Sequence, residues 1–356
     1  MFKNVIGLMS GTSMDGIDAA FLKTDGLLHV EAGEAITVPY SEDLRQKLSE
    51  LVSSGIDSKN VEEQITVKHA EVIIQLLKKT NTPANEIDLI GFHGHTVFHS
   101  PARRMTLQIG DGELLAKLTG VDVVCDFRSN DVKQGGQGAP LVPLYHQAIA
   151  TKLIKPLAIL NLGGVANISW LGHENELLAF DTGPGNALLD DYISLHLGEK
   201  QDTGGKLSLS GNVDQGSLKS LLEHPYFLKK APKSLDRNEF DWTPVSKLSI
   251  ADGATTLCAF TAEAVARSIQ IIPEPPEIWL VTGGGRHNLA MMQELKNRLE
   301  APVKSVDDIG WKGDFLEAQA FGYLAVRSLK GLPLSIPSTT GVPHPLSGGV
   351  FFKAVK

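Results

Sequence analysis

Two glycine-containing turns, each flanked by apolar strands, constrain the fold of this chain more than any other feature. The first lies in residues 7–20, GLMSGTSMDGIDAA, with apolar residues on both sides. Its turn is small and polar, so backbone N–H groups and hydroxyls stay uncovered, as a phosphate-binding loop requires. A tight hairpin turn without a ligand is the alternative, because Asp-Gly before an apolar run is a common hairpin signature.

The second turn repeats this design. Residues 157–171, LAILNLGGVANISWL, begin about where a second domain should begin in a chain of 356 residues. A third turn, Gly283-Gly284-Gly285, follows the apolar strand 278–282 and precedes a helix-like segment. Together the turns predict a duplicated α/β architecture that binds a nucleotide.

This arrangement of turns resembles the sugar kinase, Hsp70 and actin superfamily. The resemblance implies an α/β, two-domain actin-like ATPase fold with a duplicated ribonuclease-H-like core and an interdomain cleft. In that fold the two hairpins grip the nucleotide phosphates, and the late glycines lie against the adenosine. We expect an N-terminal domain at 1–145, a C-terminal domain at 146–332 with an insertion at about 203–244, and a tail at about 333–356 that packs back on the first domain.

Seven longer strings occur in a fixed order: GLMSGTSMDGIDAA, GFHGHTVFH, LQIGDGELLA, DFRSNDVKQGGQGAPLVPLYH, NLGGVANIS, FDTGPGNALLDDY and GDFLEAQAFGYLA. Together they are similar to the anhydro-N-acetylmuramic acid kinase family of peptidoglycan recycling. The resemblance covers nearly the whole chain and is weakest at 203–244.

Composition excludes several other classes of protein. The net charge is −8 without a basic run, which argues against a nucleic-acid partner. No run of roughly 18 apolar residues indicates a membrane helix, and the first residues enter a strand directly, so we expect a cytoplasmic protein. Cys125 and Cys258 are far apart, which indicates small core residues rather than a disulfide or a zinc site.

The pair His93 and His95 follows a short strand at 87–92, which places both histidines at a strand end, where ligands collect in open α/β sheets. Side chains at i and i+2 of an extended segment face the same way, so both could look into a cleft. A metal site, polar contact with a substrate, and core packing all remain open for this pair.

Arg128 directly follows an expected buried strand at 121–127 and precedes a glycine-rich loop at 135–138. This position suits bidentate binding of an anion, and a surface salt bridge is the alternative. Further along, helices are expected at 43–52 and at 62–79, the second with a buried face of Ile65, Ala70, Ile73, Ile74 and Leu77.

Asp181 follows an expected strand at 176–180 and precedes a glycine turn and a helix at 187–197. It could cap the helix or turn, or act as a general base if a substrate lies beside it. Glu317 is flanked by apolar residues in a helix at 313–329, so we expect it to be partly buried and to need a polar partner.

The family resemblance assigns roles to these positions. It implies that ATP, water and 1,6-anhydro-N-acetylmuramic acid give N-acetylmuramic acid 6-phosphate and ADP. Asp181 would deprotonate the attacking water, Arg128 would hold the sugar or the water, and Glu317 would support the site. The substrate-binding residues would be His93, His95, Arg128, Gly183 and Asn186. The ATP-binding residues would be Gly11, Thr12, Ser13, Met14, Asp15, Gly16, Ile17, Asp18, Gly163, Gly164, Asn167, Gly283, Gly284 and Gly285.

Mg²⁺ and a homodimer are also implied by the resemblance, without a defined set of metal ligands. Many superfamily members carry an aspartate just before the Gly-Thr of the first hairpin, whereas this chain has Leu8, Met9 and Ser10 there. Asp15, Asp18 or Asp181 acting through water are the candidates, because Mg²⁺ usually keeps several waters.

Two other functions remain as alternatives. One is a kinase of an intact N-acetylated hexose, in which Asp181 would deprotonate a sugar hydroxyl. The other is a nucleotide-switched binding protein of the Hsp70 or actin kind, although no appended peptide-binding domain is recognisable.

Overall fold

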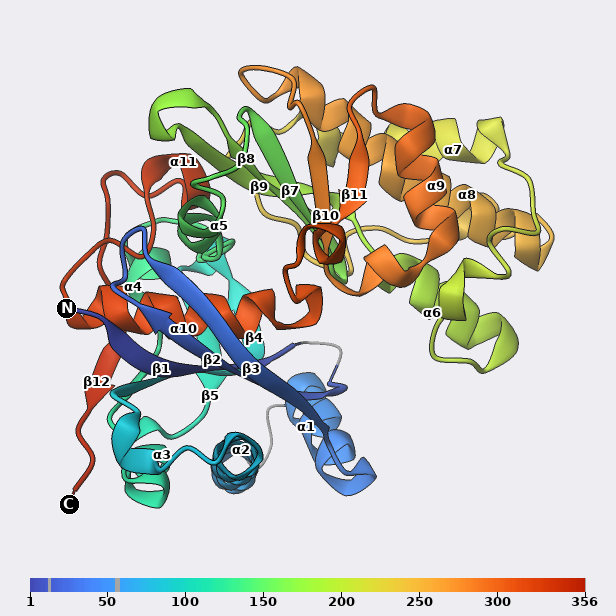
Figure 1. Cartoon of the computed structure of the whole chain (residues 1–356). Coiled ribbons are helices and arrows are strands. Elements are labelled where there is room, and N and C mark those ends of the chain that lie inside the picture. Colours follow the sequence, from blue (N-terminus) through green and yellow to red (C-terminus); the bar gives the residue numbers. More distant parts are fainter. Residues whose placement is uncertain (12–13, 55–57, 356) are drawn as a thin grey trace. The chain divides into compact units, whose positions relative to one another are not determined.

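Two compact units make up the chain in this computed structural model: Met1–Lys152 with Phe315–Lys356, here unit 1, and Leu153–Asp314, here unit 2. Residues 1–11, 14–54 and 58–355 are described (Figure 1). The helix at the end of the predicted second domain therefore groups with unit 1, unlike in the predicted division at 146–332.

Unit 1 contains two groups of elements that are far apart in the sequence. Its N-terminal part comprises β1 Lys3–Ser10, β2 Gly16–Thr24, β3 Val30–Pro39, α1 Glu42–Ser54, α2 Ser58–Thr80, β4 Leu89–Ser100, β5 Met105–Ile109, α3 Gly112–Thr119, β6 Val123–Cys125, α4 Ser129–Lys133 and α5 Pro143–Ile149. Its C-terminal part comprises α10 Leu316–Leu329, α11 Pro337–Thr340 and β12 Val350–Phe352.

The sheet of unit 1 has the order β12-β6-β4-β1-β2-β3, and β5 pairs with β4. The strands β1, β2 and β3 form an antiparallel meander, and β4 and β6 run parallel to β1. The helices α1, α2 and α3 cover one face of this sheet and α10 covers the other (Figure 1). The tail ends in β12, which pairs antiparallel with β6.

Close packing explains why α10 lies with this sheet. A Cβ atom added to Gly91 of β4 would lie 2.6 Å from the backbone carbon of Phe321 and 3.0 Å from the backbone nitrogen of Gly322. The helix therefore rests directly on the strand backbone, which glycine alone allows.

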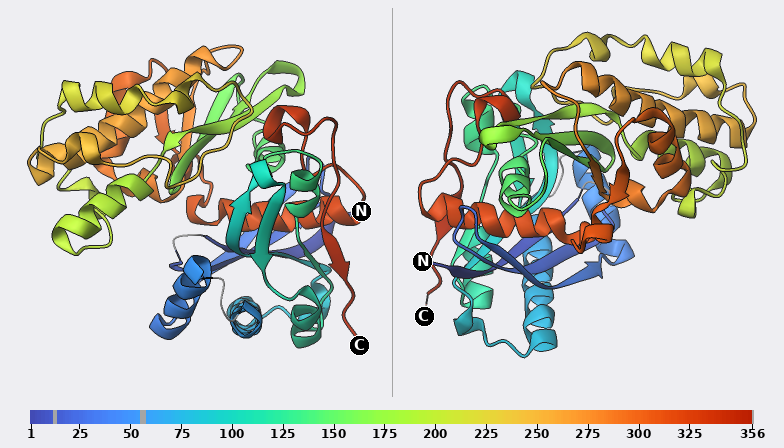
Figure 2. Two further views of the ribbon diagram at one scale, coloured as in Figure 1. Left: turned by 180° about the vertical axis from the view of Figure 1, so that it is seen from behind. Right: turned by 45° about the horizontal axis from the view of Figure 1, so that its top comes forward.

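Unit 2 repeats the strand plan. It comprises β7 Leu157–Leu162, β8 Val165–Leu171, β9 Leu177–Pro184, α6 Ala187–Leu197, α7 Gln215–Leu222, α8 Ile250–Arg267, β10 Trp279–Thr282, α9 Leu289–Arg298 and β11 Val303–Ser305. Its sheet order, β11-β10-β7-β8-β9, corresponds to β6-β4-β1-β2-β3 of unit 1. The helices of unit 2 lie on one side of its sheet (Figure 2). The predicted duplicated actin-like ATPase fold is confirmed.

The cores consist of the residues expected from their patterns, with one difference in α2. Ile74 is 41% exposed, and Val72 and Leu76 complete the buried face with Ile65 and Ile73. The predicted face included Ile74 because neighbouring apolar residues do not reveal the rotation of the helix.

Three predicted strand ends differ from the structure. β4 continues to Ser100 because its second half pairs with β5, so His93 and His95 lie within a strand and not at its end. β9 continues to Pro184 because Gly183 and Pro184 pair with β8, so Asp181 also lies within a strand. β6 ends at Cys125, since Asp126 adopts a left-handed conformation with φ of 54°.

Cys125 and Cys258 are buried free thiols, as predicted. In the ranges 1–11, 14–54 and 58–355, none of the helices combines the length and the apolar character that a bilayer crossing needs.

Candidate active site

The first predicted phosphate loop connects β1 to β2 in unit 1. Thr12 and Ser13 of this loop lie outside the described residues. The N–H of Met14 donates to the carbonyl of Gly11 at 3.1 Å, and Met14 has a left-handed φ of 56°. This hydrogen bond joins Met14 to the first residue after β1.

The residues that follow Met14 differ in burial and in their contacts. A Cβ on Gly16 would lie 2.9 Å from the Cα of Pro39, so the backbone approach requires glycine. Ile17 is fully buried, which makes its side chain part of the core. Asp15 is exposed, and the Asp18 carboxylate accepts a hydrogen bond from the Thr37 hydroxyl at 2.5 Å.

The second hairpin turn, in unit 2, is held by the start of α6. The carbonyl of Gly163 accepts from the N–H of Asn186 at 2.8 Å, and that of Gly164 accepts from the N–H of Gly185 at 3.0 Å. The Asn186 amide also donates to the carbonyl of Leu162 at 2.8 Å. Asn186 was predicted to contact the sugar, but it binds the turn at Gly163–Gly164, which was predicted to bind the nucleotide.

The third glycine turn lies against the second. Gly283 has a φ of 79°. A Cβ on Gly285 would lie 2.6 Å from the Cβ of Leu162 and 2.7 Å from Oδ1 of Asn186. Within unit 2 the structure thus brings together two turns that are about 120 residues apart in the sequence, around Asn186.

Asp181 is a buried carboxylate whose partners all lie in unit 2. It is 7% exposed. Its Oδ2 accepts from the N–H of Leu235 at 2.8 Å, and its own N–H donates to the carbonyl of Lys233 at 2.9 Å. The Tyr226 hydroxyl donates to the Asp181 carbonyl at 2.6 Å. Three hydrogen bonds therefore fix both the backbone and the carboxylate of this residue.

Burial changes the acidity of Asp181. Loss of water raises its pKa to about 7, while the Leu235 N–H and the charge of Lys233 act to lower it. Such a group is partly ionised near neutral pH and can accept a proton in a reaction. Gly183, predicted to contact the sugar, follows in the same strand and is buried against Ala264, and Asn167 pairs with Asp181 across β8 and β9.

Arg128 lies in unit 1 in a network with His93. Its Nε donates to Nε2 of His93 at 3.0 Å, and its Nη1 donates to the carbonyl of Gly138 at 2.7 Å. Burial lowers the pKa of Arg128 to about 10, and the charges of Glu317 and Asp131 act to raise it. The guanidinium therefore stays charged at neutral pH, and the negative charge of Glu317 favours this charged form.

His93 supports Arg128 as a neutral ring. Burial and the adjacent Arg128 hold the pKa of His93 well below its usual value. Nε2 then accepts from Arg128, and Nδ1–H donates to the carbonyl of Gly94 at 2.9 Å. The ring also packs 4.4 Å from the ring of Phe321, between centroids. Sequence analysis did not anticipate this pairing of His93 with Arg128.

His95 does not share the orientation of His93, so that expectation is wrong. Its Nδ1 lies 3.0 Å from Oγ of Ser10, which belongs to the face of β1 that packs toward α2. His93 packs on α10 instead. Gly94, with a φ of 72°, interrupts the strand alternation between the two histidines. Both rings are almost fully buried.

Several supporting residues gave no signal in the sequence. Lys233 and Leu235 come from the 203–244 insertion, where the family resemblance is weakest, and they reach Asp181 through backbone groups. Arg286 is buried, and it donates to Asp307 at 2.6 Å and to the carbonyl of Gly283 at 3.0 Å. Over the described ranges, no group of three or more His, Cys, Asp or Glu side chains is arranged to hold a metal ion.

The sequence of this chain is similar to known proteins over nearly its whole length. A family model described as anhydro-N-acetylmuramic acid kinase matches residues 3–354. A protein with that name from Rhodospirillum rubrum is 51% identical over 356 residues, with coverage of 98% of this chain and 94% of the relative. Another, from Paramagnetospirillum magneticum, is 51% identical over 347 residues, with coverage of 97% and 98%.

A solved structure resembles this chain in fold. Component A of (R)-2-hydroxyglutaryl-CoA dehydratase from Acidaminococcus fermentans matches with a TM-score of 0.50 and 10% sequence identity, covering 93% of this chain and 99% of that chain. At this identity the likeness concerns the fold alone.

Proposed function

This chain belongs to the anhydro-N-acetylmuramic acid kinase family and is an ATP-dependent kinase, and we propose that it opens and phosphorylates its sugar in one coupled reaction. The substrates are ATP, water and 1,6-anhydro-N-acetylmuramic acid. The products are N-acetylmuramic acid 6-phosphate and ADP, as peptidoglycan recycling requires.

The environment of Asp181 carries this proposal. A buried carboxylate with a pKa of about 7 suits proton abstraction near neutral pH, and the Leu235 N–H fixes one of its oxygens, Oδ2. Among the described residues, no hydrogen bond is formed to Oδ1. That oxygen is therefore the one we assign to water.

In this reaction each bond that forms is matched by one that breaks. Asp181 takes a proton from water while the water oxygen attacks the anomeric carbon of the sugar. The bond between that carbon and O6 breaks, and O6 takes the γ-phosphoryl group as the bond to ADP breaks. Asp181 then releases its proton to solvent. One base suffices, because phosphoryl transfer depends on positioning and charge neutralisation more than on covalent chemistry.

Other residues serve binding in this proposal. Arg128 holds the sugar or the water with its guanidinium, and Glu317 supports Arg128 through its charge. The turns at Gly11–Asp18, Gly163–Gly164 and Gly283–Gly285 bind the nucleotide through backbone groups. His93 acts through Arg128.

Mg²⁺ completes the proposal as the ion that neutralises charge on the phosphates. Asp15 and Asp18 are single carboxylates near the first turn, which fits an ion held largely by water and phosphate oxygens. We also propose a cytoplasmic homodimer, since ATP is cytoplasmic and the family resemblance implies a dimer. Light scattering with size-exclusion chromatography tests the dimer, and a monomer at micromolar concentration contradicts it.

A coupled ADP-release assay tests the proposed reaction. With Mg-ATP, we expect turnover on the anhydro sugar and little on N-acetylglucosamine or N-acetylmuramic acid. Asp181→Asn should lower kcat roughly 10²–10⁴-fold, as loss of a general base does. Preferred turnover of an intact-ring sugar would instead support a hexose kinase, and sugar-independent ATP turnover would support a nucleotide-switched binding protein.

A further inference from the structure

Lys233 is a buried cation without a direct ionic partner. It is 6% exposed. Its Nζ donates to the carbonyl of Tyr226 at 3.4 Å and lies 4.4 Å from the centroid of the Tyr226 ring. No ion pair joins it to a carboxylate in the part of the chain that the structure describes. Burial of an ammonium group without a paired carboxylate is costly, so its position needs an explanation.

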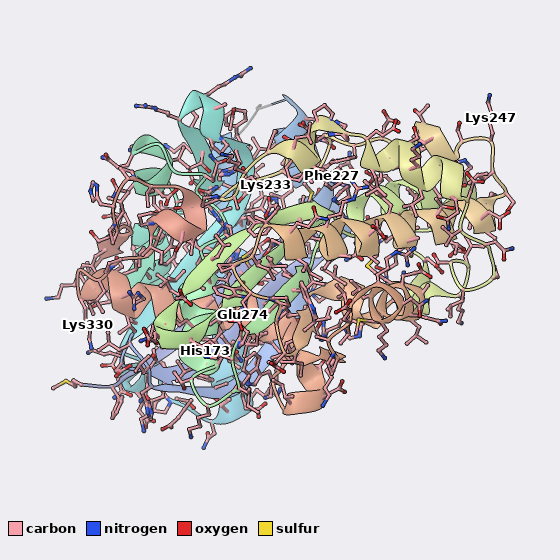
Figure 3. The ribbon with its side chains drawn as sticks, turned by 90° about the horizontal axis from the view of Figure 1, so that it is seen from above. His173, Phe227, Lys233, Lys247, Glu274 and Lys330 are labelled. Carbon is pink, nitrogen blue, oxygen red and sulfur yellow. The ribbon has the colours of Figure 1, made fainter. Side chains whose placement is uncertain are left out.

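The segment that carries Lys233 also holds Asp181. The Lys233 carbonyl accepts from the Asp181 N–H, the Leu235 N–H donates to its carboxylate, and the Tyr226 hydroxyl donates to its carbonyl. Lys233 and Phe227 lie along the segment between α7 and α8 (Figure 3). The segment therefore fixes the carboxylate, and its Lys233 ammonium lies over the ring of Tyr226, whose hydroxyl binds the Asp181 backbone.

We propose that Lys233 is a positioning residue for the kinase reaction: its buried ammonium keeps the Asp181 carboxylate ionised, ready to take a proton from water. This inference rests on the proposed role of Asp181 as the base. Without a nearby cation, a carboxylate so deeply buried would hold its proton and could not accept another.

The charges around the pair support this role. Lys233 acts to lower the pKa of Asp181 against the effect of burial. Burial and Lys229 lower the pKa of Lys233 itself, while Asp181 raises it. Tyr226 stays a neutral phenol, since burial and the charges of Asp181 and Glu239 raise its pKa. Lys233 is thus the cation that acts on the base.

The experiment compares kcat/KM between pH 5 and 9 for the parent and Lys233→Met. We expect the acidic limb of the profile to move upward by about one pH unit, with KM nearly unchanged, as loss of a nearby opposite charge predicts. Activity at pH 7 should fall about fivefold and recover at higher pH, where Asp181 ionises without help. Lys233→Arg should keep the parental profile.

Lys229→Met is the matched control. Lys229 is exposed and lies over the same Tyr226 ring, at 5.3 Å from its centroid, so its loss removes an equal charge outside the interior. We expect its acidic limb to coincide with that of the parent. Circular dichroism establishes that each variant is folded, and infrared difference spectra of the Asp181 carboxyl band follow its ionisation without using turnover.

Two results would overturn the inference. The first is a folded Lys233→Met protein with an unmoved acidic limb. The second is a rise in KM at every pH without a shifted limb, which would make Lys233 a direct substrate ligand. Failure of the proposed function is distinguishable, because Asp181→Asn would then retain turnover whatever Lys233 does.

Discussion

At the scale of single residues, the burial of Asp181 costs folding stability at neutral pH and suits its proposed role as a base. Burial of a carboxylate disfavours its charged form, yet a base must be charged to work. The chain meets both needs with the Leu235 N–H and the Lys233 charge, which act to lower the pKa that burial raises.

The pH dependence of catalysis follows from this balance. Because the ionised form of Asp181 accepts the proton, kcat/KM should fall below about pH 7, tenfold for each further unit, and level off above it. Steady-state kinetics in constant-ionic-strength buffers measures the profile. An acidic limb near pH 4, the range of an ordinary carboxyl, would show that Asp181 does not limit the reaction.

The same residue should lower stability at neutral pH. A carboxyl group with a raised pKa binds its proton more tightly in the folded than in the unfolded protein, so stability falls as pH rises from about 4 to about 7. Asp181→Asn removes this loss and should stabilise the fold at pH 8 by up to about 4 kcal/mol. Urea unfolding at pH 8 measures the change. A destabilised variant would contradict the assigned environment.

Arg128 and His93 show what a sequence leaves open at this scale. The position of Arg128 after an apolar strand was informative, and its charge persists as expected. The pattern could not predict that His93 accepts a hydrogen bond from it, because the two are 35 residues apart, with His93 in β4 and Arg128 beyond the end of β6, the neighbouring parallel strand. The different orientations of the His93 and His95 side chains depend on the left-handed conformation of Gly94 between them.

At the scale of elements, local patterns predicted hairpins and helices well and strand lengths less well. The hairpin β1–β2, the hairpin β7–β8 and the helix α6 agree with the predicted segments. β4 and β9 are longer because strands β5 and β8 pair with residues that alone indicate a turn. Pairing partners are tertiary information, which local composition does not contain.

The glycine turn at 283–285 allows a test with a built-in control. Gly285→Ala should destabilise the protein by about 1–3 kcal/mol, because the new methyl group meets Leu162 and Asn186 at less than 3 Å. Gly284→Ala should change stability by less than about 0.5 kcal/mol, because its nearest neighbour would lie 3.9 Å away. Thermal unfolding compares the two variants. Equal losses would mean that the turns do not pack as described.

At the scale of the whole molecule, the internal repeat was the most informative part of the sequence. Two glycine hairpins predicted a duplicated fold, and both sheets share one strand order. The predicted division was less accurate for α10, since sequence order does not show that β4 offers Gly91 for direct contact with that helix. The sequence predicted an insertion at about 203–244, but its contact with Asp181 was not foreseen.

Coupling of ring opening to phosphorylation is the central claim of this account. Turnover of the anhydro sugar in ¹⁸O-water, followed by mass spectrometry of the sugar phosphate, tests it most directly. We predict one ¹⁸O atom at the anomeric carbon of the product, and product formation that is roughly 10²–10⁴-fold slower with Asp181→Asn. Turnover without label at that carbon, or an Asp181→Asn variant that loses only a few-fold in rate, would contradict the claim.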